Sequence, residues 1–285
     1  MEELTRGTAK ALLPPRNERQ AKWTFGRVLL CCGSAAMPGA AVISTRAALR
    51  SGVGLCELAS VPAALLSLPA TAPECILCPM PEGSSGSIAE TGLPVLLRQA
   101  ERCSALLCGC GLTVCDDTRA LVRGLLAHFT GILVLDADAI NIVSEEPALL
   151  KTAAGQVLLT PHARELSRLL HIREAGIPEA IAFAAEMGVT LLCKSGTGAA
   201  IVGPGGPVYF LEAPNSGMAK GGSGDVLAGL TAGLAAQGLL PERAAALGAF
   251  LHAEAGRLAR ERYGARAMQP TDVIDSMGAA FLTLE

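Results

Sequence analysis

Aromatic residues are scarce in this sequence: Phe, Trp and Tyr make up only 3% of its 285 residues. The core must therefore consist of Ala, Leu, Val, Ile and Gly, which favours close packing of helices on a sheet. Charged residues are also few, at 17%, whereas apolar residues reach 51%, so a large core is available and a disordered chain is excluded. A net charge of −3 argues against nucleic acid or an anionic membrane as the main partner.

The ten cysteines form no recognisable framework. Cys75 and Cys78 make one C-x-x-C pair, but no second pair or nearby histidine completes a zinc site. Most of the others lie in apolar runs, where cysteine acts as a small hydrophobic residue. We therefore expect the cysteines to form no disulfide framework and to bind no metal, and we expect a cytoplasmic location.

Segments that direct a chain to a membrane are missing as well. The first residues, M-E-E-L-T-R, lack the apolar core of a signal peptide, and the longest uncharged run, 28–45, is interrupted by glycine and proline. The P-loop motif G-x-x-x-x-G-K-[S/T] is absent, and no G-x-G-x-x-G follows the first predicted strand. These two absences exclude a P-loop enzyme and a Rossmann dinucleotide site.

Strands and helices alternate regularly along the chain. Apolar runs that end in turns predict strands at 26–34, 54–60, 74–79, 105–108, 132–135, 157–159 and 189–193, then a hairpin of 199–202 and 208–211. Helices are predicted at 38–51, from the loop after 86 to about 102, from 116 onward, and at 165–171, 177–187, 224–236, 241–262 and 271–283. This alternation indicates an α/β fold with three α/β/α layers and a mostly parallel sheet. No linker divides the chain, so we predict one domain over 1–285, with 1–25 as a tail or first loop.

The most distinctive stretch is P-N-S-G-M-A-K-G-G-S-G-D-V-L-A-G at 214–229, in which five glycines surround Asp225. An apolar helix is expected to follow directly. Unpaired N–H groups at a helix start bind anions with the help of the helix dipole, and glycine lets a ligand approach the backbone. Asp225 either complements the dipole or acts as a base beside a phosphate, and the glycines favour the base.

Other polar residues follow the predicted strands, where ligands bind in open α/β sheets. They are Ser34, the run 109–112, Asp136 with Asp138 and Asn141, the run 160–162, and the run 194–197. Asp136 and Asp138 could hold Mg²⁺ through water or accept bonds from loop N–H groups. Loop bonding is favoured for Asp138, and both alternatives stay open for Asp136.

The basic residues also have two interpretations each. Lys194 can meet an anionic phosphate or remain a solvated lysine at a strand end. His162 can contact a ligand or be held by structural hydrogen bonds. His128, His171 and His252 fall within helical patterns and are expected to be structural or exposed.

Five segments occur in a fixed order: C-G-S-A-A-M-P-G-A-A, G-C-G-L, V-L-D-A-D-A-I-N, L-L-T-P-H-x-x-E and N-S-G-M-A-K-G-G-S-G-D-V-L-A-G. Together they resemble the ADP/ATP-dependent NAD(P)H-hydrate dehydratases of the ribokinase-like superfamily, over residues 26–283. The last segment alone is shared with vitamin kinases of that superfamily. The chain departs from the family pattern at three places. Cys110 replaces the proline of the usual G-P-G-L, and Ala163-Arg164 replaces the usual Pro-Gly. The usual Ser-His-Lys-Gly corresponds to Gln20 to Trp23 in this chain.

The resemblance implies a nicotinamide nucleotide repair enzyme, a hydro-lyase. It would dehydrate the (6S) hydrate of NADH or NADPH with Mg²⁺ and a nucleotide donor. The resemblance favours ADP, which would yield AMP and phosphate, and ATP is the other possible donor. Carried over by position, the contacts to the hydrated nucleotide would be Ala40, Gly111, His162 and Asp225. The adenine nucleotide would be held by Lys194, Ser195, Gly196, Thr197, Gly198 and Gly224.

The resemblance also implies a mechanism and an assembly. Asp225 would be the catalytic base, and the N–H groups of Gly222, Ser223 and Gly224 would form the anion hole. The family commonly forms tetramers, and many relatives carry a fused epimerase domain. This chain is too short for that domain, so we expect it to act alone or with a separate epimerase. The alternatives are an ATP-dependent kinase of a vitamin precursor, which would use the same base and loop, and a nucleotide-binding regulatory module.

Overall fold

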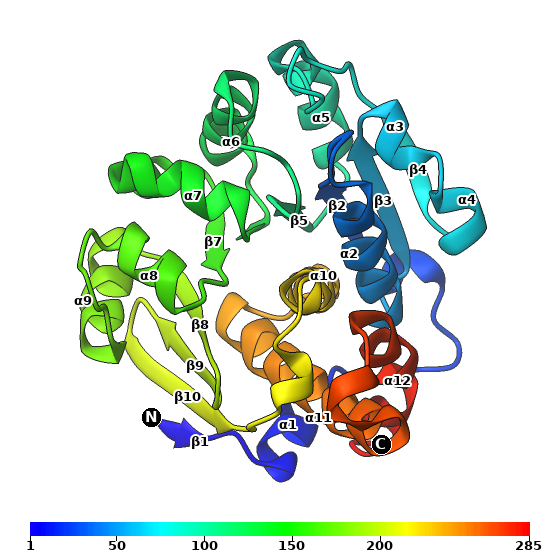
Figure 1. Ribbon diagram of the computed structural model, residues 1–285, viewed down its shortest axis with the longest axis vertical. Helices are drawn as coiled ribbons and strands as arrows, with labels where there is room; N and C mark the ends of the chain where they lie inside the picture. The colour runs from blue at the N-terminus through cyan, green and yellow to red at the C-terminus, as the bar shows by residue number, and fades with distance from the viewer.

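The computed structural model describes residues 1–206 and 208–285, and within them the chain forms a ten-stranded sheet with helices on both faces (Figure 1). The strand order is β1-β10-β9-β8-β7-β6-β5-β2-β3-β4. The strands are β1 (Glu2–Glu3), β2 (Arg27–Cys31), β3 (Leu55–Ser60), β4 (Ile76–Pro79), β5 (Ala105–Cys108), β6 (Ile132–Leu135), β7 (Gln156–Leu159), β8 (Thr190–Ser195), β9 (Gly198–Gly203) and β10 (Gly206–Glu212).

The predicted mostly parallel α/β sheet is confirmed. All neighbouring strands from β4 to β8 are parallel, whereas β9 runs antiparallel to both β8 and β10 as the predicted hairpin. Parallel strands need crossover helices that cover both faces, which explains why a central strand such as β5 is buried at every residue. The carboxyl ends of these strands therefore share one edge of the sheet.

Helices fill the connections between the strands. The α-helices are α1 (Arg6–Leu12), α2 (Pro38–Arg50), α3 (Pro62–Leu65), α4 (Leu68–Thr71), α5 (Leu93–Ala100), α6 (Asp116–His128), α7 (Asp138–Glu145), α8 (Ala163–Leu169), α9 (Ile177–Met187), α10 (Ser223–Ala236), α11 (Pro241–Ala267) and α12 (Pro270–Leu282). The 3₁₀ helices are η1 (Lys22–Phe25), η2 (Glu90–Gly92), η3 (Pro147–Thr152) and η4 (Ser216–Met218). Proline opens α2, α11 and α12, where a missing N–H leaves no bond unmade.

Several segments differ from the prediction: no helix was predicted for α3, α4, η3 or η4, and two further differences concern the N-terminal region and the residues after β6. The first 25 residues are not simply a tail or loop, because they contain β1, α1 and η1. Thr5 caps α1 by accepting the N–H of Thr8 (3.2 Å), and the buried Leu12 anchors α1 to the core. No helix was predicted after β6, but α7 begins there at Asp138, because its carboxylate suits the first helical turn.

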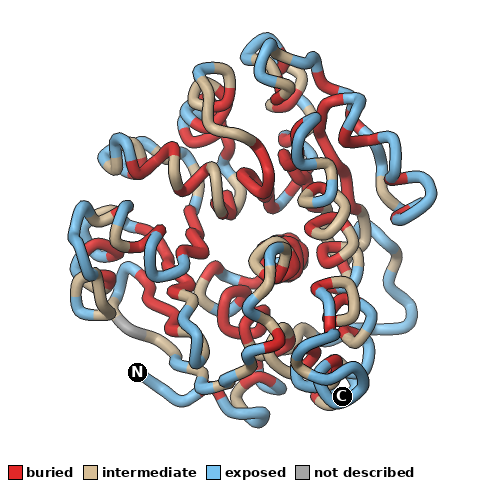
Figure 2. Tube along the Cα trace, in the orientation of Figure 1, coloured by how far each residue is buried: buried red, intermediate tan, exposed pale blue. Residues whose placement is uncertain are grey.

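Helix α10 is the centre of the fold (Figures 1 and 2). Every residue from Val226 to Ala236 is buried, which the small and apolar residues of this helix permit. Gly229 lets α10 pack tightly on α2, since an added Cβ would lie 2.1 Å from the carbonyl oxygen of Ser44. Among the described residues, none of the helices has the length and apolar character needed to span a bilayer.

Candidate active site

The glycine-rich loop leads into the N-terminus of α10. Its N-cap residue, Gly222, has φ 97°, and an added Cβ would lie 3.0 Å from Cδ1 of Ile43, so this turn requires glycine. The first N–H groups of an α-helix have no intrahelical partner. In the described structure the N–H of Ser223 donates to the carbonyl of Lys220 at 3.2 Å, so this member of the predicted anion hole is already engaged. The N–H groups of Gly222 and Gly224 make no such bond and can bind an anion, which the helix dipole favours.

Two side chains fix this loop to α11. The amide of Asn215 donates to the carbonyl of Gly256 (3.0 Å), and its oxygen accepts the N–H of Gly217 (3.1 Å). Lys220 Nζ donates to two backbone carbonyls at the end of α11, including that of Met268. The chain's own contacts therefore hold the loop in its anion-binding geometry, as electrostatic stabilisation of a reacting phosphate requires.

A cavity of about 400 Å³ opens beside this helix end. Of the six residues predicted to hold the adenine nucleotide, five line it: Lys194, Ser195, Gly196, Gly198 and Gly224. The sixth, Thr197, lines a neighbouring cavity of about 380 Å³ together with Lys194 and Ser195. The structure thus gathers residues from β8, β9 and α10 around one space of the size that ligand pockets have.

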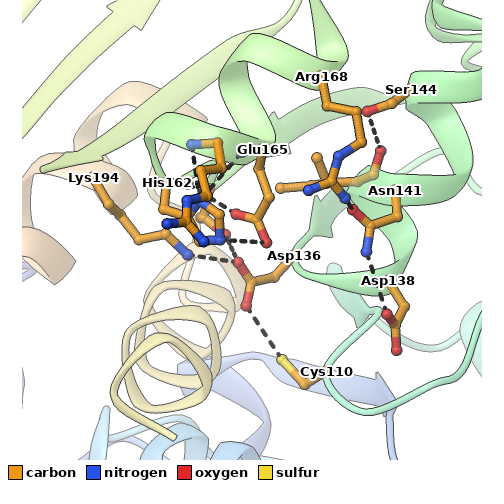
Figure 3. A network of polar contacts seen from close by, with 12 residues as sticks. Cys110, Asp136, Asp138, Asn141, Ser144, His162, Glu165, Arg168 and Lys194 are labelled. Carbon is orange, nitrogen blue, oxygen red and sulfur yellow. Dashed lines mark hydrogen bonds and ion pairs between the residues drawn. The ribbon is translucent and has the colours of Figure 1, made fainter. Parts of the chain in front are cut away.

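Lys194, which lines this cavity, forms a buried ion pair with Asp136 (Figure 3). Asp136, at the end of β6, is almost fully buried, and its Oδ1 lies 2.9 Å from Nζ of Lys194 in β8. The hydroxyl of Thr160, which follows β7, donates to the same oxygen at 2.5 Å. Because β6, β7 and β8 are adjacent strands, their carboxyl ends place these three side chains side by side. Neither predicted interpretation of Lys194 or Asp136 included this pair.

The charges of this pair are well defined. Burial acts to raise the pKa of Asp136, but the charge of Lys194 and the hydrogen bond from Thr160 outweigh it, so the net shift of that pKa is downward. Burial likewise acts to lower the pKa of Lys194, but the Asp136 carboxylate holds it above its usual value. Both groups are therefore charged at neutral pH.

Asp225 lies in the first turn of α10 beside this pair. Burial raises its pKa to about 6, and the negative charge of Asp136 acts in the same direction. A carboxylate with a pKa near neutrality is suited to accept a proton at physiological pH. This position and this pKa match the predicted role of base better than the alternative of a simple dipole complement.

One group of side chains could hold a metal ion within the described residues. Sγ of Cys110, Asp136 and Asp225 offer ligand atoms that lie within 4.8 Å of one another. This set does not fit Mg²⁺, which prefers hard oxygen ligands, whereas Cys110 offers a thiol whose pKa hydrogen bonding to Cys32 and burial raise well above its usual value. The Lys194 ammonium also already supplies positive charge to Asp136.

Asp138 behaves as predicted. Its carboxylate accepts the backbone N–H of Thr113 at 2.8 Å, so it bonds to the loop after β5. Asn141, one turn along α7, donates its amide to the same carboxylate at 3.4 Å. These contacts give Asp138 a structural role at the edge of the site (Figure 3).

The four residues predicted to contact the substrate fall in two places. Ala40 and Gly111 are neighbours, since an added Cβ on Gly111 would lie 2.7 Å from that of Ala40. His162 lines the 400 Å³ cavity near Lys194, and it also caps α8. Its Nδ1 accepts the N–H groups of Arg164 (3.1 Å) and Glu165 (3.2 Å), so the structural interpretation of His162 is confirmed, and its contact with a ligand stays a prediction.

His252 on α11 was assigned no ligand role by the sequence, yet it lines the cavity. Burial lowers the pKa of His252 to about 4, and the positive charge of Lys194 acts in the same direction. The imidazole is therefore neutral at physiological pH. Its Nε2 is buried without a hydrogen-bond partner in the described structure. His128 and His171 are structural, because they bond to the carbonyls of Gly124 and Ser144.

The sheet with its anion-binding helix end has a ribokinase-like fold. A ribokinase-like superfamily protein from Enterococcus faecalis matches it with a TM-score of 0.83 and 26% identity, over 99% of this chain and 96% of that one. A protein-family model described as NAD(P)H-hydrate dehydratase matches residues 28–278. The chain therefore belongs to the NAD(P)H-hydrate dehydratase family.

Two curated relatives are similar over nearly the whole chain. A bifunctional NAD(P)H-hydrate repair enzyme from Moorella thermoacetica is 38% identical over 99% of this chain, which spans only 54% of that protein. An ADP-dependent (S)-NAD(P)H-hydrate dehydratase from Xanthomonas campestris is 33% identical over 90% of this chain and 87% of that protein. The chain thus spans about half of the bifunctional relative and most of the single-function one.

Proposed function

We propose that this protein dehydrates the (6S) hydrate of NADH or NADPH with ADP as the phosphate donor, and releases NAD(P)H, AMP and phosphate. The observation that carries the proposal is the place of Asp225, in the first turn of α10 between the anion-binding loop and the buried Asp136–Lys194 pair. Family membership supports the hydrate as substrate, and the relative from Xanthomonas campestris, named as ADP-dependent, supports ADP as donor.

The proposed reaction begins with proton transfer. Asp225 takes the proton of the substrate hydroxyl while that oxygen attacks the terminal phosphate of ADP, and AMP leaves. The N–H groups of Gly222 and Gly224 stabilise the negative charge that develops on the transferred phosphate, whereas the N–H of Ser223 is shared with the carbonyl of Lys220. The ring nitrogen then expels phosphate, and loss of a proton from the adjacent ring carbon restores the dihydropyridine.

The substrates are assigned to the two parts of the site. The cavity at Lys194, Ser195, Gly196, Gly198 and Gly224 would hold ADP, with Thr197 at its margin, and His252 would face the same ligand. The hydrated nucleotide would lie on the Ala40–Gly111 side and reach toward His162 and Asp225. Mg²⁺ would be carried by the donor phosphates, because the chain's own Cys110-containing cluster does not fit it.

The proposal also covers the domain organisation, the location and the assembly of the protein. We propose a single domain that acts in the cytoplasm as a homotetramer and receives its (6S) substrate with the help of a separate epimerase. Membership of a family that commonly forms tetramers supports this assembly. Light scattering on the purified protein measures the mass of the assembly, and a monomer at all concentrations would contradict the tetramer.

An absorbance assay tests the proposed activity. The protein is incubated with hydrated NADH, Mg²⁺ and either ADP or ATP, and the return of NADH absorbance is followed. We expect recovery with ADP, and none with the Asp225→Asn variant as matched control. Recovery with ATP alone would contradict ADP as donor. ATP consumption only after addition of a hydroxyalkyl pyrimidine or thiazole would identify a vitamin kinase instead, and binding without turnover would identify a regulatory module.

A further inference from the structure

Asp136 lies close enough to Asp225 to govern its charge. Oxygen atoms of both carboxylates and Sγ of Cys110 lie within 4.8 Å of one another. Asp136 stays ionised although it is buried, because Lys194 Nζ lies 2.9 Å from its Oδ1 and Thr160 donates to the same oxygen. Its other oxygen, Oδ2, accepts the Cys110 thiol at 3.7 Å. Three segments therefore hold this carboxylate in one orientation beside the proposed base.

Lys194 lies against the helix turn that carries Asp225. An added Cβ on Gly224 would be 3.4 Å from Lys194 Nζ and 3.8 Å from Asp136 Oδ2. A lysine ammonium is a mobile point charge on a flexible stem. Without the carboxylate of Asp136, it would turn to Asp225, which is the remaining carboxylate of the cluster. An aspartate that is paired with an ammonium holds protons weakly and makes a poor base.

We propose that Asp136 is a positioning residue, which binds the Lys194 ammonium and so keeps Asp225 free to accept a proton. Its own negative charge adds to this effect, because a like charge nearby disfavours the ionised form of Asp225. The proposal rests on the proposed function insofar as Asp225 is the base. Its electrostatic content, however, can be measured without any substrate.

Several charged or titratable groups surround Asp225. They are Cys110 after β5, Asp136 at the end of β6, Asp138 at the start of α7, and Lys194 in β8. The neighbouring helices α2 and α12 present the uncharged Ile43 and Pro270 to this loop. Burial raises the pKa of Asp225 to about 6 and the Asp136 charge adds to this, while Cys110 and Lys194 act to lower it. The carboxylate and the ammonium thus act in opposite directions on the same group.

The test is the titration of Asp225 in variants of the pair. The chain contains seven aspartates, so NMR of protein labelled with ¹³C at the aspartate carboxyl groups gives a countable set of signals. The Asp225 signal is assigned by its loss in Asp225→Asn. Its midpoint is then measured in the wild type and in Asp136→Asn. Asp116→Asn is the matched control, because it removes one negative charge from an exposed side chain on α6.

We expect a wild-type midpoint near 6. In Asp136→Asn it should fall by at least about one pH unit, since a carboxyl group within reach of an unopposed positive charge drops by about 1–3. Asp116→Asn should leave it in place. A midpoint in Asp136→Asn that equals or exceeds the wild-type value would overturn the proposal.

A second variant covers the case in which Asp136→Asn does not fold. The double change Asp136→Asn with Lys194→Gln removes both charges and leaves no buried ion without its partner. Its midpoint should lie below that of the wild type, because the repulsion is gone, and above that of Asp136→Asn wherever both fold. A midpoint of the double variant at or above the wild-type value would contradict the role of Asp136.

Kinetics separate this inference from the proposed function. In the dehydration assay, the acid limb of the kcat/KM profile should move with the NMR midpoint, whereas a merely structural role would lower kcat without moving the limb. If the midpoint moves but no hydrate is turned over, the proposed function fails and the role of Asp136 stands. If hydrate is turned over and neither the midpoint nor the limb moves, the role of Asp136 fails and the function stands.

Discussion

Replacing Asp225 with asparagine should make the protein inactive and more stable at the same time. The activity loss follows from the missing proton acceptor, because a positioned base contributes roughly 10²–10⁴ in rate. The stability gain follows from burial, which raises the pKa of this carboxyl group from 3.8 to about 6. The difference corresponds to about 3 kcal/mol at pH 7, since each tenfold change in proton affinity is worth about 1.4 kcal/mol.

The sign of this effect depends on pH. A carboxyl group with a raised pKa in the folded state stabilises the fold while protonated, below the unfolded value, and loses that contribution as pH rises through the folded value. For Asp225 the loss occurs between about pH 4 and pH 6. Asparagine stays neutral, so the variant should gain stability over the wild type through this window and reach its full advantage at pH 7.

Urea unfolding at several pH values measures this advantage. We expect the free energy of unfolding of Asp225→Asn to exceed that of the wild type by about 2–3 kcal/mol at pH 7, and the two to converge near pH 3. Asp116→Asn, on an exposed side chain, should show no comparable gain. A variant that is less stable than the wild type at pH 7 would refute the reasoning that burial strains this carboxylate. Turnover near that of the wild type would remove Asp225 from the role of base.

Three further substitutions test the loop and its helix. Gly222→Ala should lower the free energy of unfolding in urea by about 1–2 kcal/mol and weaken ADP binding in calorimetry, because φ of Gly222 is 97°. Gly221→Ala is the control and should change neither quantity, since an added Cβ there would have no atom within 4 Å. Gly229→Ala should lower the free energy of unfolding by at least about 2 kcal/mol, because its methyl group would clash with the carbonyl of Ser44. Gly278→Ala, in open space on α12, is the control and should raise the free energy of unfolding by up to about 1 kcal/mol. Lys220→Met should raise KM for ADP by a larger factor than it lowers kcat, because the loop loses one of its anchors on α11. A fall in kcat as large as the rise in KM would contradict this role.

The fold could be predicted largely from the sequence because its signals are local. Apolar runs that end in turns marked β2, β5 and β6, and Pro38 and Pro241 marked the starts of α2 and α11. Helix α1 was missed because it is short: only two of its seven residues, Ala9 and Leu12, are buried. Two apolar positions are too few to show a helical period in the sequence, and their burial depends on packing against the core. Helix α7 was missed because a short apolar run after a strand reads equally well as a loop.

The site was predicted only in part, for a related reason. The glycines and Asp225 lie together in the sequence, so their local chemistry could be interpreted directly. The pairing of Asp136 with Lys194 depends on β6, β7 and β8 being adjacent, and strand order is a long-range property. Asp136, Thr160 and Lys194 each follow a predicted strand in the sequence, but nothing local in the sequence shows that these strands are neighbours. Cys110 was noted only as a departure from G-P-G-L, and its contact with Asp136 could not be foreseen without the fold.

The most direct measurement of the central claim is the stoichiometry of the proposed reaction. Purified protein is mixed with hydrated NADH, Mg²⁺ and a limiting amount of ADP, and NADH, AMP and phosphate are quantified together by chromatography. The account predicts that the three products appear in equal amounts and stop when ADP is exhausted, and that Asp225→Asn forms none of them at a comparable rate. NADH that forms without AMP, or AMP that forms without NADH, would contradict it.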